Sequence, residues 1–168
     1  PDGGPESGPR LDYGDVYAPQ GFHDESGRAL LFGWVEDGRA DPTEWAGATT
    51  VPRVVTVRGG DLWQAPAPEL GALRGEHSHH EATVTGETDL DIQGKHLELV
   101  AEFEGDADEV GLAVRHGNGE RVEVVVDRAA GELRVDRTPV PDAGERTHRG
   151  PAPGGERTAL RVFVDACV

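Results

Sequence analysis

The chain has 168 residues, including 24 glycines and 12 prolines, and only 36% of them are hydrophobic. This composition favours an all-β protein with many turns over one built on long helices. The formal net charge of -16 argues against a nucleic-acid partner, which needs a basic surface, and disfavours an anionic membrane surface. The sequence has no run of about 18 apolar residues, so it predicts no membrane-spanning helix.

The first part of the chain has the pattern of four consecutive strands. Residues 1–10 are rich in Pro and Gly and are expected to be a flexible lead-in. Strands are predicted at 16–22, 29–35 and 51–57 and from residue 62, with a polar loop at 36–48. Four short strands within 11–66 have the size of one propeller blade, which cannot bury both of its faces alone.

The second part has the pattern of an antiparallel β-sandwich, expected over 81–168. A linker at 67–80 precedes it, and Pro68 before a Glu-Leu-x-x-Leu-Arg pattern predicts one or two helical turns there. Strands are predicted at 96–104, 110–116, 121–127, 132–136 and 158–165, with a Pro/Gly/Arg loop at 136–156. The chain stops inside a strand-like run and starts without Met, so we expect a truncated sandwich and a piece of a longer protein.

Aromatic residues are concentrated in the first part. Of nine rings, seven lie between Tyr13 and Trp63, next to carboxylates such as Asp12 and Asp15. Aromatic faces stack on sugar rings while carboxylates accept hydrogen bonds from hydroxyls, which favours carbohydrate recognition. The alternative is that these rings fill the core of the blade.

Other patterns predict no catalytic or metal site in this chain. The HSHH run (77–80) lacks carboxylate or cysteine partners at ligand spacing, so an exposed linker is expected rather than a zinc or nickel site. The single cysteine, Cys167, excludes an internal disulfide and is expected to be a small buried residue of a strand. No cofactor is expected. The compartment stays open, with the cytoplasm favoured over secretion.

Several spaced motifs resemble glycoside hydrolase family 32, the family of invertases, levanases, inulinases and sucrose-phosphate hydrolases. The motifs are DYGDVYAPQGFHDESGRALLFGW, W-x-G at 45–47, VPRVV and LWQAPAPELGALRG. The later run LRVFVDACV is similar to a strand of the family's C-terminal sandwich. The resemblance covers about residues 11–168 and implies the last blade of a five-bladed propeller followed by that sandwich.

Family membership implies hydrolysis of terminal β-fructofuranosides with retention, which needs two carboxyl groups about 5–5.5 Å apart. In the family these groups lie in Asn-Asp-Pro and Glu-Cys motifs, and a third carboxylate lies in Arg-Asp-Pro. None of the three motifs occurs here, and RADP at 39–42 is read as a coincidence in a polar loop. We therefore expect no catalytic residue in this chain, whose blade is expected to pack on the preceding blades of the parent protein.

The resemblance carries three residues over as substrate-binding candidates. Asp12, in D-Y-G, matches an aspartate that faces the leaving-group sugar, and Tyr17 and Trp34 match ring positions near the fructose pocket. Some plant members have lysine at the position of Asp15, which leaves that residue's contact open. Trp34 also fits a purely structural role. A fructose-containing sugar is the expected ligand.

Two other interpretations stay open. The chain could be a non-catalytic carbohydrate-binding module with exposed rings, or the inactive product of a truncated gene.

Overall fold

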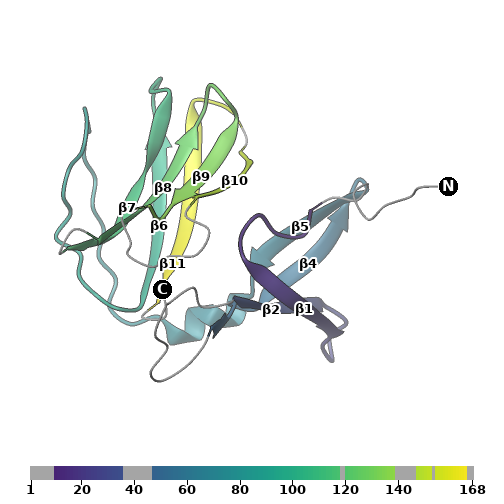
Figure 1. Ribbon diagram of the computed structural model, residues 1–168. Helices are drawn as coiled ribbons and strands as arrows, with labels where there is room; N and C mark the ends of the chain where they lie inside the picture. The colour runs from purple at the N-terminus through teal and green to yellow at the C-terminus, as the bar shows by residue number, and fades with distance from the viewer. Residues whose placement is uncertain (1–9, 36–46, 118–119, 139–146, 153, 166–168) are drawn as a thin grey trace.

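The computed structural model describes residues 10–35, 47–117, 120–138, 147–152 and 154–165. Within them the protein is all-β, with a single short helix between a blade-like sheet and a sandwich (Figure 1). The first sheet contains β1 (Val16–His23), β2 (Ala29–Val35), β3 (Ala48–Thr49), β4 (Arg53–Arg58) and β5 (Asp61–Pro66). The sandwich contains β6 (Leu97–Glu104), β7 (Glu109–Gly117), β8 (Glu120–Asp127), β9 (Glu132–Asp136), β10 (Thr147–Pro151) and β11 (Arg157–Val164).

The blade is an antiparallel sheet with the strand order β1-β2-β4-β5, and the short strand β3 also pairs with β2. The apolar residues of ALLFGWV and RVVTVR lie on both sides of their strands, which suits strands that have a neighbour on both faces. In this chain, no hydrophobic side chain described for the five strands is fully buried, and seven of the eight β1 residues are exposed. The blade therefore presents apolar faces that the described part of the chain leaves uncovered.

The sandwich has a four-stranded sheet, β10-β9-β8-β7, facing a two-stranded sheet of β11 and β6. The core lies between them, where Val124 and Val126 of β8 meet Leu160 of β11. Val124 and Val126 are two residues apart, so they lie on the same face of β8, the face toward β11. Arg128 joins the two sheets, since its Nε donates to Thr158 Oγ1 at 2.9 Å and its Nη1 donates to the Gly105 carbonyl at 2.6 Å.

Strand β10 corrects the prediction of a loop over residues 136–156. Its sequence, THRGP, has Gly and Pro in place of alternating apolar residues, so it carries no strand signal of its own. The strand forms because residues 147–151 pair with Asp136–Glu132 of β9 at the edge of the sheet. The predicted third strand at 51–57 also begins two residues later, at Arg53.

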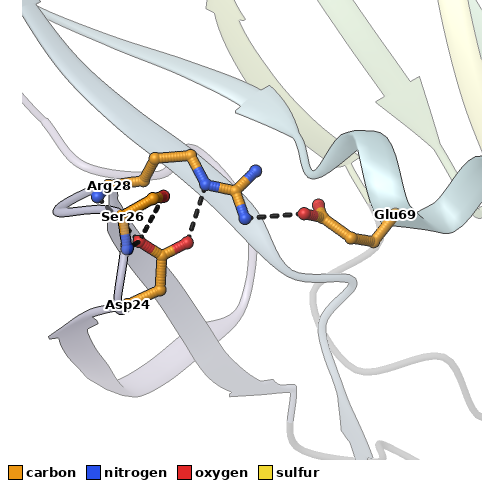
Figure 2. Close-up of polar contacts among 4 residues, drawn as sticks. All are labelled: Asp24, Ser26, Arg28 and Glu69. Atoms are coloured by element: carbon orange, nitrogen blue, oxygen red, sulfur yellow. Dashed lines mark hydrogen bonds and ion pairs between the residues drawn. The ribbon is translucent and has the colours of Figure 1, made fainter.

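The turn between β1 and β2 is organised by one carboxylate, that of Asp24 (Figure 2). Its Oδ1 accepts hydrogen bonds from the Ser26 hydroxyl at 2.7 Å and from the backbone N–H of Ser26 and Arg28. The bond from the Ser26 hydroxyl first, and then the bonds from the Arg28 side chain and backbone N–H, hold the pKa of Asp24 well below its usual range. Arg28 then bridges Asp24 Oδ2, at 2.7 Å, to Glu69 Oε1, at 2.6 Å.

Glu69 lies in the 3-10 helix Pro68–Leu73, so the Arg28 bridge fixes the blade hairpin to the start of the linker. Pro68 stands at the start of this helix, where a backbone N–H has no partner within the helix, so its lack of an N–H costs no hydrogen bond. After the helix, Arg74 forms a two-bond ion pair with Glu98 of β6, at 2.6 and 2.8 Å. Ion pairs thus tie the 3-10 helix region to the blade hairpin on one side and to β6 on the other.

Glu98 predicts a pH dependence of stability. Its hydrogen bonds with Arg74, and then those with Arg161, lower the pKa of this carboxyl from 4.5 to about 2 in the folded protein. Because the folded pKa is the lower one, the stabilisation is complete above pH 4.5 and is lost as pH falls toward 2. We expect Glu98→Gln to lower the free energy of unfolding by about 1–2 kcal/mol at pH 7.

Urea unfolding of both proteins at pH 7 and pH 2.5 measures this effect. The wild type is expected to lose more stability than Glu98→Gln on acidification, so that the two converge at the lower pH. An equal loss in both proteins would contradict a role for this carboxylate.

Candidate functional site

Two of the three predicted binding residues lie together on the blade. Tyr17 of β1 is directly opposite Trp34 of β2, and their rings meet edge to face, with centroids 6.2 Å apart and planes at 72°. Gly47 lies against the indole, since a Cβ at this position would come within 2.1 Å of Trp34 Nε1. The backbone at Gly47 thus packs against the Nε1 edge of the indole, while 67% of Tyr17 and 38% of Trp34 stay exposed.

The register places further rings on the same face of the sheet. Phe22 is opposite Leu30, Gln20 is opposite Phe32, and Thr56 is opposite Trp63, so all of these residues share the face of Trp34. Phe22 and Phe32 are stacked, with centroids 6.1 Å apart and planes at 8°. We call this set the aromatic face: Tyr17, Phe22, Phe32, Trp34 and Trp63. Its rings are half-exposed, so they form a surface rather than a closed core.

Asp12 lies apart from the two rings and is held by blade residues. Its Oδ2 forms an ion pair with Arg53 Nη1 at 2.6 Å, and its Oδ1 accepts the Gly14 N–H at 2.7 Å. Arg53 is opposite Leu31 in the sheet, on the face opposite to Trp34. The structure therefore brings Tyr17 and Trp34 together, and places Asp12 in a separate polar cluster with Arg53.

Asp15 contacts the sandwich. Its Oδ2 lies 2.8 Å from Arg137 Nη2 and 3.2 Å from His148 Nε2, and all three side chains are largely buried. Next to this cluster, Tyr13 covers Gly150 of β10, where a Cβ would come within 2.9 Å of the ring carbon Cγ. These contacts join the start of the blade to the edge of the sandwich.

The remaining predicted motifs give no further site. His77, His79 and His80 are exposed and lie in no helix or strand. Among the described residues, no three His, Cys, Asp or Glu side chains come close enough to hold a metal ion. RADP (39–42) and Cys167 lie outside the residues that the structure describes, as does Trp45. No helix in the described ranges has the length and hydropathy needed to cross a membrane.

Sequence reasoning missed the partners of Asp12 and Asp15. Arg53 and Arg137 lie 41 and 122 residues from their carboxylates, and no local pattern joins them. Arg53 of β4 and Arg137, the residue after β9, reach the segment 11–15 only through the tertiary fold. The sequence is rich in arginine, but no motif indicated which arginines pair with these two aspartates.

The fold and this surface define a propeller-type blade joined to a β-sandwich, with an aromatic face on the blade. Residues 2–66 match the family described as "Glycosyl hydrolases family 32 N-terminal domain", and residues 69–168 match "Glycosyl hydrolases family 32 C terminal". The chain belongs to glycoside hydrolase family 32. This confirms the resemblance carried by the DYG and GW motifs.

Characterised relatives agree with this family. The chain is 33% identical to a sucrose-6-phosphate hydrolase of Staphylococcus xylosus and 34% identical to a raffinose invertase of Escherichia coli. Each match covers 92% of this chain and 34% of the relative. The chain thus spans about a third of the length of these relatives.

Solved structures show the same fold. A GH32 beta-fructofuranosidase of Bombyx mori matches with a TM-score of 0.63 and 24% identity, over 94% of this chain and 33% of that one. A mutant of the same Bombyx mori protein in complex with sucrose matches equally well, with a TM-score of 0.63 and 22% identity, over 96% of this chain and 34% of that one.

Proposed function

We propose that this chain is the C-terminal part of a glycosidase that hydrolyses terminal β-fructofuranosides with retention. The observation that carries the proposal is the family match over residues 2–66 and 69–168, together with relatives named as hydrolases of sucrose phosphate and as invertase. The substrate class is a fructose-containing sugar. The two catalytic carboxyl groups that such a reaction needs belong to the part of the protein that precedes this segment.

In this proposal the chain supplies pocket wall and scaffold. Tyr17 and Trp34 present ring surface to the fructose pocket, and Asp12 accepts hydrogen bonds from hydroxyls of the leaving-group sugar. Tertiary contacts support these binding roles, because Gly47 packs against the indole of Trp34 and Arg53 forms an ion pair with the carboxylate of Asp12. Neither group needs to exchange a proton for these roles.

The other three residues of the aromatic face, Phe22, Phe32 and Trp63, are proposed to pack on a neighbouring blade of the same protein. Trp63 and Phe22, more than half exposed here, lie far along the sheet from Tyr17 and suit burial rather than sugar contact. Burying rings of this size contributes about 2–3 kcal/mol each, which a blade inside a full propeller obtains from its neighbours.

Fructose release by the full-length protein tests the proposal. We expect fructose release from sucrose or sucrose phosphate. NMR is expected to show that the fructose first released keeps the β configuration of the substrate. A full-length protein that hydrolyses neither these sugars nor inulin and levan would overturn the proposal.

The exposure of the rings also favours a second candidate, a non-catalytic module that binds fructan through its aromatic face. Calorimetric titration of residues 1–168 with inulin separates the two candidates. Millimolar or tighter binding by this segment alone supports the module, whereas the enzyme fragment presents only part of a subsite and is expected to bind far more weakly.

A further inference from the structure

We propose that Arg53 is a positioning residue for Asp12, and that through it strands β4 and β5 of the blade control recognition of the leaving-group sugar. The inference rests on the proposed function, because it takes Asp12 as the carboxylate that meets that sugar. It adds a residue that does not itself need to touch the substrate.

The geometry is that of a side chain held from several directions. Arg53 Nη1 lies 2.6 Å from Asp12 Oδ2 and 3.2 Å from Gln64 Oε1. One nitrogen of this β4 side chain thus donates to both Asp12 and Gln64. Gln64 of β5 in turn donates to the Leu11 carbonyl at 2.5 Å, which fixes the backbone just before Asp12. The carboxylate and its backbone are therefore tied to the same two strands.

This arrangement leaves the carboxylate able to bind a ligand. Each oxygen of Asp12 has one described protein donor, Arg53 for Oδ2 and the Gly14 N–H for Oδ1, and a carboxylate offers about four acceptor positions. The side chains of Asp12 and Arg53 are each 20% exposed. The pair is thus partly buried, where charge-assisted hydrogen bonds are strong, while retaining access for sugar hydroxyls.

A positioned acceptor is worth more than a mobile one, because a fixed carboxylate loses little conformational entropy when it binds the substrate. Without Arg53, Asp12 would keep only the local bond to the Gly14 N–H, two residues away. We therefore expect Arg53 to act on substrates whose leaving group is a sugar, and to have little influence where the leaving group is small.

The test compares two substrates in the full-length protein, sucrose and methyl β-D-fructofuranoside, whose leaving groups are glucose and methanol. Arg53→Ala is expected to lower kcat/KM for sucrose about tenfold or more, the effect of losing one charge-assisted hydrogen bond. For the methyl fructoside the expected change is less than about twofold. The matched control is Arg58→Ala on the same strand, whose guanidinium lies over Trp63 at 5.4 Å, and it is expected to change neither rate.

A double-mutant cycle shows whether Arg53 acts through Asp12. Adding Arg53→Ala to Asp12→Ala is expected to cause no further selective loss on sucrose. An equal loss on both substrates, or additive losses in the double variant, would overturn the proposal.

A milder variant keeps the test decisive if Arg53→Ala does not fold, as judged by circular dichroism. Gln64→Leu removes the tie to the Leu11 carbonyl and is expected to lower kcat/KM on sucrose about threefold without affecting the methyl fructoside. The absence of this selective loss would overturn the proposal. A wild-type protein that releases no fructose from either substrate would instead overturn the proposed function.

Discussion

Replacing Gly111 by alanine is expected to lower the free energy of unfolding by about 3 kcal/mol or more. Gly111 of β7 is opposite Val125 of β8, and a Cβ there would lie 2.3 Å from the Val124 carbonyl oxygen. The obstacle is backbone in a paired strand, so it cannot rotate away. Moving it displaces Val124 and Val126, which form the buried core.

Urea unfolding of residues 1–168 measures the effect of Gly111→Ala. The matched control is Gly75→Ala, because no heavy atom lies within 4 Å of a Cβ at that position. We expect the control to change stability by less than about 0.5 kcal/mol. Equal midpoints for the two variants would show that β7 and β8 are not packed as described.

Replacing Gly150 by valine is expected to open the junction between blade and sandwich. A Cβ there would lie 2.9 Å from Tyr13 Cγ and 3.2 Å from Tyr13 Cβ, and Tyr13 Cβ cannot move unless its backbone moves. Displacing Tyr13 also moves Asp15 from Arg137 and His148. We expect a loss of about 1–3 kcal/mol and faster proteolysis of the segment 10–15.

The Tyr13→Ala background supplies the control for Gly150→Val. With the ring removed, the same valine meets no obstacle from Tyr13, so its cost is expected to fall by at least half. A cost that is unchanged in this background would mean that Tyr13 is not the residue that Gly150 accommodates.

The strands of the sandwich were predictable because their apolar residues alternate over a sufficient length. Val122, Val124 and Val126 alternate with polar or half-buried neighbours, and the structure buries these three. Strand β10 was not predictable, because Gly150 and Pro151 contribute no such alternation and the strand depends on its partner β9. A local sequence pattern predicts a strand only when the residues of that strand themselves alternate between apolar and polar.

The candidate site was predictable as a set of residues but not as an arrangement. The sequence HDESGR between two predicted strands indicates the β1–β2 hairpin, but the pairing of Tyr17 with Trp34 also depends on a register shift between Tyr17 and Gln20, which no sequence pattern indicated. The partners of Asp12 and Asp15 depend on long-range topology that the sequence does not state. Asp15 in particular forms a contact between blade and sandwich, a role that the resemblance left open. The roles of Asp12, Tyr17 and Trp34 toward a sugar stay predictions.

We propose that this segment contributes to recognition of a fructoside but does not contain the catalytic carboxyl groups. Fructose release from sucrose, measured side by side for the full-length protein and for residues 1–168, tests it most directly. We expect release by the full-length protein and none by the segment. Measurable release by the purified segment alone would contradict it.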